Sequence, residues 1–287
     1  MKKIGFIGVG VMGKPMVRNL MKNGCEVYIY TRTKSKAADI ISEGAKWCES
    51  VKECAKGRDI VISIVGYPKD VEEVYFGENG IIQNADRGTF IIDMTTTSPA
   101  LSEKIYALAK ERGLYALDAP VSGGDSGAKN GTLSIMAGGD KEVFDKVYPV
   151  FEMMGKTIIY EGKAGSGQHT KMANQIAIAG TIAGVCEAIA YAEKTGLDKT
   201  LMLDSISKGA AGSWQMTNNG AKVIQNDFEP GFFIKHFIKD MKIACEEAEK
   251  RGQNLETLDT VLKMYQNLED NGYGNLGTQA LIKYYEK

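Results

Sequence analysis

The first thirty residues place a glycine-rich turn between two predicted strands, and this arrangement constrains the fold more than any other feature. Residues 3–8 form a short apolar run that predicts a buried strand. A glycine motif follows, then a segment with helical periodicity that ends at Asn23-Gly24, and residues 25–30 predict a second strand. Strand, glycine turn, helix and strand in this order are typical of a dinucleotide-binding unit.

Each glycine of the motif has its own physical role in that interpretation. Gly8 permits the tight turn, Gly10 lets a pyrophosphate approach the backbone, and Gly13 lets the helix lie close on the sheet. The helix N-terminus presents free N–H groups and the positive end of its dipole to the phosphates. We therefore predict that the whole motif binds the cofactor: Gly8, Val9, Gly10, Val11, Met12 and Gly13.

The residues after the second strand indicate which nicotinamide cofactor is preferred. NAD-binding versions of this unit place Asp or Glu there to bond the ribose 2′-hydroxyl. Residues 31–36 carry no acid but several cations and hydroxyls. Arg32 can clamp a 2′-phosphate, and Thr33 and Lys36 can donate hydrogen bonds to it. This pattern predicts NADP, with a solvated basic turn as the alternative interpretation.

Predicted strands continue to alternate with helices up to residue 160. Further strands are predicted at 45–47, 59–65, 88–93, 114–118, 132–137 and 156–160. Such alternation predicts an α/β fold, a Rossmann-type doubly wound parallel sheet over residues 1–163. Ligands bind beyond the carboxyl ends of the strands in these sheets, so Val65 is predicted to contact the cofactor.

The loop after the predicted strand 114–118 offers a second binding feature. Ser122, Gly123 and Gly124 leave backbone N–H groups uncovered, which is typical of a nest for a carboxylate or another anion. An ordinary glycine-rich turn is the alternative interpretation. The loop is expected to continue through residues 127–131.

A long apolar segment divides the chain. From Met172 to Ala192 almost every residue is apolar or small, which predicts a helix buried on all sides. Lys171 and Asn174 share one face of this helix. The lysine either extends its amine to solvent or takes part in a reaction. Only helical patterns follow, so residues 164–287 are predicted to form an all-α C-terminal domain that begins with a long interdomain helix.

Composition argues against several classes of function. The formal net charge of −1 gives no basic face for nucleic acid. Five scattered cysteines and two histidines lack metal-ligand spacing, which favours a reduced cytoplasmic protein with no metal site. No segment reaches the roughly 18 uncharged apolar residues of a membrane span, because Lys171 and Glu187 interrupt the nearest candidate.

Four blocks in a fixed order resemble a known family nearly end to end. They are the segments 6–20, 118–124, 165–174 and 235–241. The chain is similar to the β-hydroxyacid dehydrogenases, which include 3-hydroxyisobutyrate dehydrogenases, tartronate semialdehyde reductases and glyoxylate/succinic semialdehyde reductases. Thr31-Arg32-Thr33 resembles the Asn-Arg-Thr of the NADP-preferring semialdehyde reductases. Thr95 replaces a usual serine and Gln175 a common second asparagine, which leaves the fine choice of substrate open.

The resemblance implies a role for each matching residue. It implies that Lys171 is catalytic, that Thr96 and Lys239 contact the cofactor, and that Ser122, Gly123, Gly124, Asn174, Phe232 and Asp240 belong to the substrate site. By itself, the Lys239–Asp240 pair would indicate a plain solvated ion pair.

The predicted reaction is NADP-dependent hydride transfer between a short aldehyde acid and its hydroxy acid, with Lys171 as acid and base. The alternatives are an NAD-dependent 3-hydroxyisobutyrate or other β-hydroxyacid dehydrogenase, and a catalytically silent NADP-binding homologue. An imine reductase is disfavoured by Lys171, which those enzymes replace. The resemblance also implies a homodimer or homotetramer. Glyoxylate and the succinic, methylmalonate and tartronate semialdehydes, with sulfolactaldehyde, are all compatible substrates.

Overall fold

The computed structural model describes residues 2–286 and contains two compact units that divide between Lys171 and Met172. The outermost positions of the two predicted domains, 1 and 287, lie outside the described residues. The division falls inside one long helix, α9 (Ser166–Thr195), so this helix contributes residues to both units.

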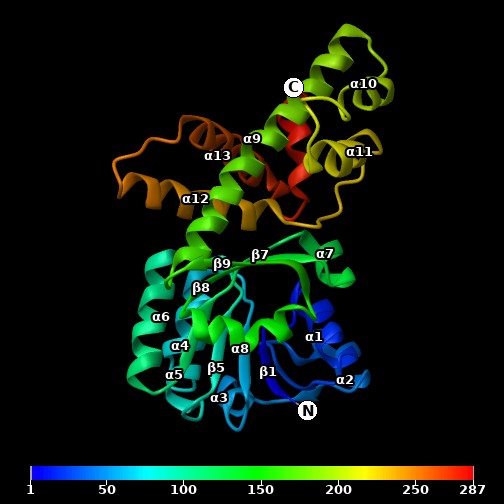
Figure 1. The fold of residues 1–287 in the computed structure, drawn as a ribbon. Coiled ribbons are helices and arrows are strands. Elements are labelled where there is room, and N and C mark those ends of the chain that lie inside the picture. Colours follow the sequence, from blue (N-terminus) through cyan, green and yellow to red (C-terminus); the bar gives the residue numbers. More distant parts are fainter. Residues whose placement is uncertain (1, 287) are drawn as a thin grey trace. The chain divides into compact units, whose positions relative to one another are not determined.

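The first unit is built on one nine-stranded sheet (Figure 1). The strand order is β3-β2-β1-β4-β5-β6-β8-β7, with β9 paired to β8. The strands β1 to β6 pair only in parallel among themselves, which confirms the Rossmann-type fold class. The strands are β1 (Lys3–Ile7), β2 (Glu26–Tyr30), β3 (Lys46–Trp47), β4 (Ile60–Ser63), β5 (Phe90–Asp93), β6 (Tyr115–Asp118), β7 (Val121–Ser122), β8 (Leu133–Gly139) and β9 (Gly155–Gly162).

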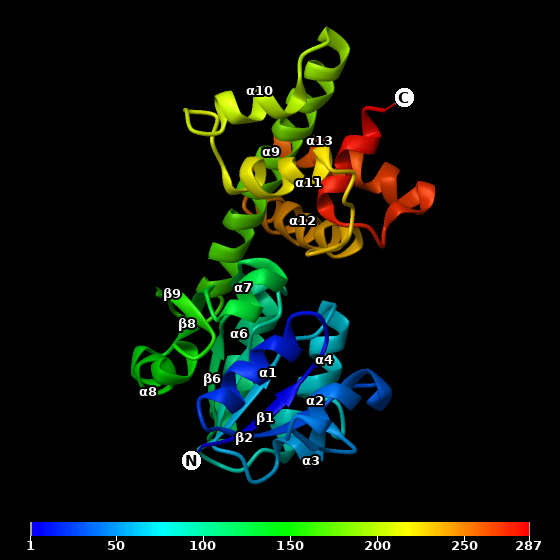
Figure 2. The same cartoon turned by 90° about the vertical axis from the view of Figure 1, so that its right-hand side faces the viewer.

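Alternate side chains of the strands pack into two separate cores. Phe6 and Ile62 pack with α1 (Gly13–Lys22), α2 (Ala38–Ser42) and α8 (Lys141–Phe151). Ile7 and Val61 pack with the helices of the other face, which Figure 1 labels: α3 (Val51–Ala55), α4 (Pro68–Phe76), α5 (Ile81–Asn84) and α6 (Pro99–Glu111). Figure 2 shows α3, α4 and α6 from a second side. Burial on both faces explains why these strands appear in the sequence as continuous apolar runs.

The last strands depart from the wholly parallel sheet that the sequence predicts. Strand β8 runs antiparallel to β6 and β7 and parallel to β9. Residues 127–131 were predicted as loop, but most of them belong to α7 (Gly124–Asn130). Glycines give this helix a low propensity, yet Asn19 Nδ2 of α1 donates to its Ala128 carbonyl at 2.7 Å. A tertiary contact therefore supports a helix that local sequence does not indicate.

The second unit is helical, as predicted, and has one core that includes the fully buried Ile182, Phe237 and Tyr265. The predicted helix 213–226 forms as a π-helix followed by a short α-helix, and the predicted helix 277–286 forms as a 3₁₀ helix. The elements are the remainder of α9, α10 (Lys199–Ile206), the π-helix η2 (Gln215–Gly220), α11 (Ala221–Ile224), α12 (Ile234–Glu249), α13 (Glu256–Leu268), the π-helix η3 (Glu269–Tyr273) and the 3₁₀ helix η4 (Thr278–Tyr284).

Helix α9 is not buried on all sides, contrary to the prediction. Val185 and Ile189 are buried, whereas Ala177, Thr181 and Glu187 are exposed. The exposed face carries mostly small residues such as Ala177 and Gly184. The prediction treated small and large apolar residues alike, and it therefore assigned this face to the interior. Within residues 2–286, α9 is the one helix long and apolar enough to cross a membrane by length and composition, with a mean hydropathy of 1.4. Core helices of soluble proteins meet the same criterion.

Candidate active site

The glycine turn between β1 and α1 has the shape that a dinucleotide requires. Gly8 has a φ of 101°, and its amide donates to the Tyr30 carbonyl at 2.9 Å. A Cβ on Gly13 would lie 2.0 Å from the Gly8 carbonyl oxygen, so only glycine lets α1 start this close to β1. A Cβ on Gly10 would meet nothing within 4 Å. No side chain caps α1, so the turn fits the pyrophosphate of NAD(P).

The other residues of the turn differ in exposure. Val9 is buried in the core, Met12 is half-buried just before α1, and Val11 is exposed. The buried valine anchors the turn in the core, whereas Gly10 and Val11 are exposed, and backbone recognition of phosphate needs such exposed residues.

Arg32 follows β2 and pairs with an acid that sequence reasoning missed. Its Nη1 lies 3.1 Å from Oδ1 of Asp70 in the first turn of α4. The Asp70 side chain is 9% exposed and the Arg32 side chain 75%, so the ion pair tethers Arg32 while leaving most of it in solvent. Asp70 Oδ2 also accepts from the Tyr67 amide at 3.1 Å. Asp70 stands at the third position of α4, where an acid commonly bonds the backbone at the helix start. No sequence pattern indicates that Asp70 also pairs with Arg32.

Thr33 and Lys36 lie beside Arg32 along the chain. Thr33 is extended and immediately precedes the 3₁₀ helix η1 (Lys34–Ala37), and both side chains are exposed. Their exposure is compatible with donation to a 2′-phosphate, the role that the sequence predicts.

A buried hydrogen-bond network joins the carboxyl ends of β4 and β5. The Val65 amide donates to Thr95 Oγ1 at 3.0 Å, and the Thr95 amide donates to Asp93 Oδ1 at 3.1 Å. Ser63 Oγ donates to the same Asp93 oxygen at 2.9 Å. The network therefore places two predicted cofactor contacts, Val65 and Thr96, on neighbouring segments at one edge of the sheet.

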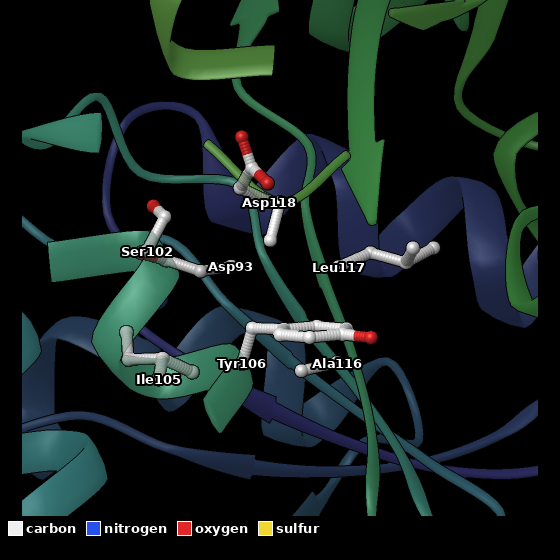
Figure 3. Close-up of a pocket in the computed structure, with 8 residues that line it drawn as sticks. Asp93, Ser102, Ile105, Tyr106, Ala116, Leu117 and Asp118 are labelled. Atoms are coloured by element: carbon white, nitrogen blue, oxygen red, sulfur yellow. The ribbon is translucent and has the colours of Figure 1, made fainter. Parts of the chain in front are cut away.

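Asp93 also lines a small cavity of the first unit, whose lining residues are shown in Figure 3. The cavity volume is about 10 Å³, close to what a single water occupies. Within the described part of the chain, Asp93 Oδ2 and Ser102 Oγ are buried without a hydrogen-bond partner. Burial raises the pKa of Asp93 to about 6, and the negative charge of nearby Asp118 contributes in the same direction.

This raised pKa predicts a pH-dependent stability. Between about pH 4 and pH 6 native Asp93 retains a proton that the unfolded chain has lost, so its contribution to stability falls as pH rises through this window. Asp93→Asn keeps an acceptor for Thr95 and removes the titration. We expect the unfolding free energy of the variant to rise relative to that of the wild type by on the order of 3 kcal/mol between pH 4 and pH 6. Its melting temperature should rise relative to that of the wild type over the same range.

Melting curves of both proteins at pH steps between 4 and 8 measure this difference. Other carboxyl groups titrate in both proteins and cancel. Asp145→Asn, which changes an exposed carboxyl group paired with Lys141 at 2.5 Å, is the control. A constant difference between Asp93→Asn and wild type across this range would contradict the prediction.

Asp118 and Gln168 hold the start of α9. The Gly165 and Gln168 amides donate to the two Asp118 carboxylate oxygens at 2.8 and 3.0 Å. The Gln168 side chain in turn bonds to both Thr95 and Thr97. Lys171 follows one turn later and is only 6% exposed. The structure thus places the predicted catalytic lysine on a helix whose first turn is bonded to the segment containing Thr96.

Ser122–Gly124 forms the start of α7. Ser122 ends β7 opposite Ser134, and Gly123 and Gly124 have φ values of 128° and 62°. Both conformations favour glycine, and no side chain caps the helix. The predicted anion nest is therefore a glycine-rich helix N-terminus, where backbone N–H groups gather.

The second unit brings together another set of predicted residues. Asn174 Nδ2 donates to Gln175 Oε1 at 2.8 Å, and Gln175 Nε2 donates to Asp240 Oδ2 at 2.6 Å. Lys239 Nζ lies 2.7 Å from Asp240 Oδ1, and these two side chains are 12% and 2% exposed. The solvated-pair interpretation of Lys239 and Asp240 is wrong, because α12 carries both into the interior.

Phe232 precedes α12 and is half-buried. Its ring centroid lies 5.7 Å from that of the core residue Phe237, so packing holds the ring in place. Among residues 2–286, no group of three or more His, Cys, Asp or Glu side chains is arranged to hold a metal ion.

Comparisons with known proteins match both units. The family profile for the NAD binding domain of 6-phosphogluconate dehydrogenase matches residues 3–162, and that for the NAD-binding region of NADP-dependent 3-hydroxyisobutyrate dehydrogenase matches residues 165–285. The uncharacterized oxidoreductase YkwC of Bacillus subtilis (strain 168) is 55% identical, over 100% of this chain and 99% of its own length. The 2-hydroxy-3-oxopropionate reductase of Escherichia coli (strain K12) is 38% identical, over 99% and 97%.

A solved structure is similar along its whole length. The Mycobacterium tuberculosis 3-hydroxyisobutyrate dehydrogenase with L-serine superimposes with a TM-score of 0.91 at 30% sequence identity, and the match covers 100% of each chain.

Proposed function

The chain belongs to the β-hydroxyacid dehydrogenase family of NAD(P)-dependent oxidoreductases, and we propose that it interconverts a short aldehyde acid and its hydroxy acid with NADP. One observation supports this most strongly. Lys171 is buried one turn after a helix start that is hydrogen-bonded to the Thr95–Thr97 segment, in the unit that contains the glycine turn. An amine is thereby fixed near residues predicted to contact the cofactor.

The cofactor, when bound, supplies or accepts the hydride. In the reductive direction Lys171 donates a hydrogen bond to the aldehyde oxygen, balances the negative charge that develops there, and delivers the proton. In the oxidative direction the lysine accepts the proton of the alcohol. Asn174 lies three residues along the same helix and bonds the reacting oxygen or orients the amine.

A kinetic screen tests the proposed activity. The panel is glyoxylate, succinic semialdehyde, methylmalonate semialdehyde, tartronate semialdehyde and sulfolactaldehyde, each with NADPH and with NADH. We expect at least one aldehyde acid to give a kcat/KM with NADPH of about 10⁴ M⁻¹s⁻¹ or more. Binding of NADPH without turnover of any of them would instead indicate a catalytically silent homologue.

Arg32 is proposed to determine the preference for NADPH. Arg32→Ala should raise the KM for NADPH about 10- to 100-fold and leave the KM for NADH nearly unchanged, because charge-assisted hydrogen bonds to the 2′-phosphate are lost. Lys34→Ala is the matched control, since it removes a neighbouring cation that pairs with Glu49 at 3.0 Å. Equal losses with both cofactors would refute the assignment.

The second candidate function is an NAD-dependent β-hydroxyacid dehydrogenase. The carboxylate of Asp70 beside Arg32 is the observation in its favour, since an acid near the ribose disfavours a 2′-phosphate. The mycobacterial relative was solved with L-serine, which is itself a 3-hydroxy acid. Oxidation of such acids with NAD, faster than any reduction with NADPH, would support this alternative.

The assembly and location are part of the proposal. We propose a homodimer or homotetramer by analogy with the family, and Tyr191, Leu201 and Trp214 of the second unit, which are 67%, 66% and 57% exposed, are candidates for burial in it. All five cysteines are free, which suits the cytoplasm. Light scattering of the purified protein measures its molar mass in solution. A molar mass equal to that of a single chain would contradict the proposed homo-oligomer.

A further inference from the structure

We propose that Gln168 is a positioning residue that sets the place of Lys171 relative to the segment 95–97, here called the cofactor loop. This inference rests on the proposed function, because it assigns a role within that reaction. Gln168 is 0% exposed and belongs to the first turn of α9. It has no assigned role in the reaction, and its side chain contacts the loop rather than a substrate position.

The two hydrogen bonds of the Gln168 side chain bracket Thr96. Its Oε1 accepts from the Thr97 amide at 3.0 Å, and its Nε2 donates to the Thr95 carbonyl at 2.7 Å. Thr95 is also bonded to Val65 and Asp93 on its other side. The cofactor loop is therefore held between the ends of two strands and the start of α9, and Gln168 is its link to the helix.

Close packing prevents the first turn of α9 from shifting by itself. A Cβ on Gly167 would lie 2.3 Å from the Met136 carbonyl oxygen and 2.8 Å from that of Asp118. The helix start thus lies directly against β6 and β8, where Asp118 also accepts its amides. Lys171 follows Gln168 by three residues on the same rigid helix, so the bonds of Gln168 define the distance from Lys171 to Thr96.

This distance matters because hydride and proton must reach adjacent atoms of one carbonyl group. A misplacement of about 1 Å at a reacting centre costs about 10²-fold in rate. Loss of the Gln168 amide would leave the Thr97 amide and the Thr95 carbonyl buried without a partner, and the loop would rearrange to solvate them. The distance between the Lys171 amine and the cofactor loop would then no longer be fixed.

Two variants and a matched control test the proposal. Gln168→Met keeps the size of the side chain and removes both bonds, and Gln168→Asn keeps an amide that is too short to reach both Thr95 and Thr97. Gln279→Met is the control, because Gln279 is 2% exposed and its Nε2 donates to the Asp227 and Glu229 carbonyls at 3.0 and 3.1 Å. All assays are run well below the melting temperature of each variant.

The measurement is single-turnover oxidation of NADPH with the best aldehyde acid, using NADPH with and without deuterium at the transferred position. Both Gln168 variants should lower the single-turnover hydride-transfer rate at saturating NADPH about 10- to 100-fold. In steady-state assays they should raise the isotope effect on kcat, with little change in the KM for the aldehyde acid. Gln279→Met should lose stability and keep the wild-type rate and isotope effect. Wild-type values in the Gln168 variants, or an equal rate loss in Gln279→Met, would overturn the proposal.

A separate arm distinguishes failure of this inference from failure of the proposed function. If none of the tested aldehyde acids supports NADPH oxidation by the wild type, the proposed function fails. NADPH affinity, followed by its fluorescence, still tests Gln168 through the cofactor loop. Gln168→Met should then weaken NADPH binding about 10-fold relative to Gln279→Met, because the Thr95 carbonyl and the Thr97 amide of the cofactor loop lose their buried partner. Equal affinities of these two variants would overturn the role of Gln168.

Discussion

Lys171→Ala is expected to lower the rate of hydride transfer by on the order of 10²–10⁴-fold, the usual worth of a positioned acid–base group. The variant loses the group that balances charge on the carbonyl oxygen and exchanges its proton. NADPH affinity and the fold should be retained, because the predicted pyrophosphate site lies in the glycine turn between β1 and α1. Single-turnover NADPH absorbance, with cofactor affinity measured separately, gives both quantities.

Two companion variants sharpen this result. Lys171→Arg should restore little activity, because a guanidinium stays protonated and cannot exchange the proton. Lys194→Ala, near the exposed C-terminal end of the same helix, should behave as the wild type. Near-normal hydride transfer in Lys171→Ala would make the lysine structural, and the acid would then have to be sought at Lys239 or a bound water.

A neutral aldehyde of the same length as the best aldehyde acid is expected to react with a kcat/KM lower by about 10²-fold or more. The neutral compound cannot form charge-assisted hydrogen bonds with the N–H groups of Ser122–Gly124, and two such bonds account for a loss of this size. Steady-state rates with the two compounds and saturating NADPH measure the ratio. Equal efficiencies would show that the carboxylate is not bound at this helix start.

Gly123→Ala assigns the effect to the start of α7. The φ of 128° at Gly123 disfavours any side chain, so the variant should distort the nest and narrow the preference for the carboxylate. Gly131→Ala also places an alanine at a positive φ, 64° in the left-handed helical region at the other end of α7, where the strain is smaller, and should leave the preference intact. A preference unchanged in Gly123→Ala would place the carboxylate elsewhere.

The sequence by itself determined the fold class and the family. The alternation of predicted strands with helices predicted a parallel sheet, because parallel strands need a crossover between them that is usually a helix. The glycine turn was recognisable because Gly8 adopts a φ of 101° and Gly13 meets the Gly8 carbonyl oxygen, five residues earlier, at a distance that no Cβ could approach. These features are local, so a short window of sequence contains the physical reason for each of them.

Only the tertiary structure decided the partners of the side chains. Arg32 and Asp70 are 38 residues apart in sequence, and Gln168 lies 73 residues from the Thr95 carbonyl that it bonds. The burial of Lys239 and Asp240 also depends on which face of α12 packs inward. Hydrogen bonds and ion pairs act over about 3 Å in space, irrespective of distance along the chain. Local periodicity therefore predicts the elements, whereas the contacts between their ends exist only once the sheet and helices have packed.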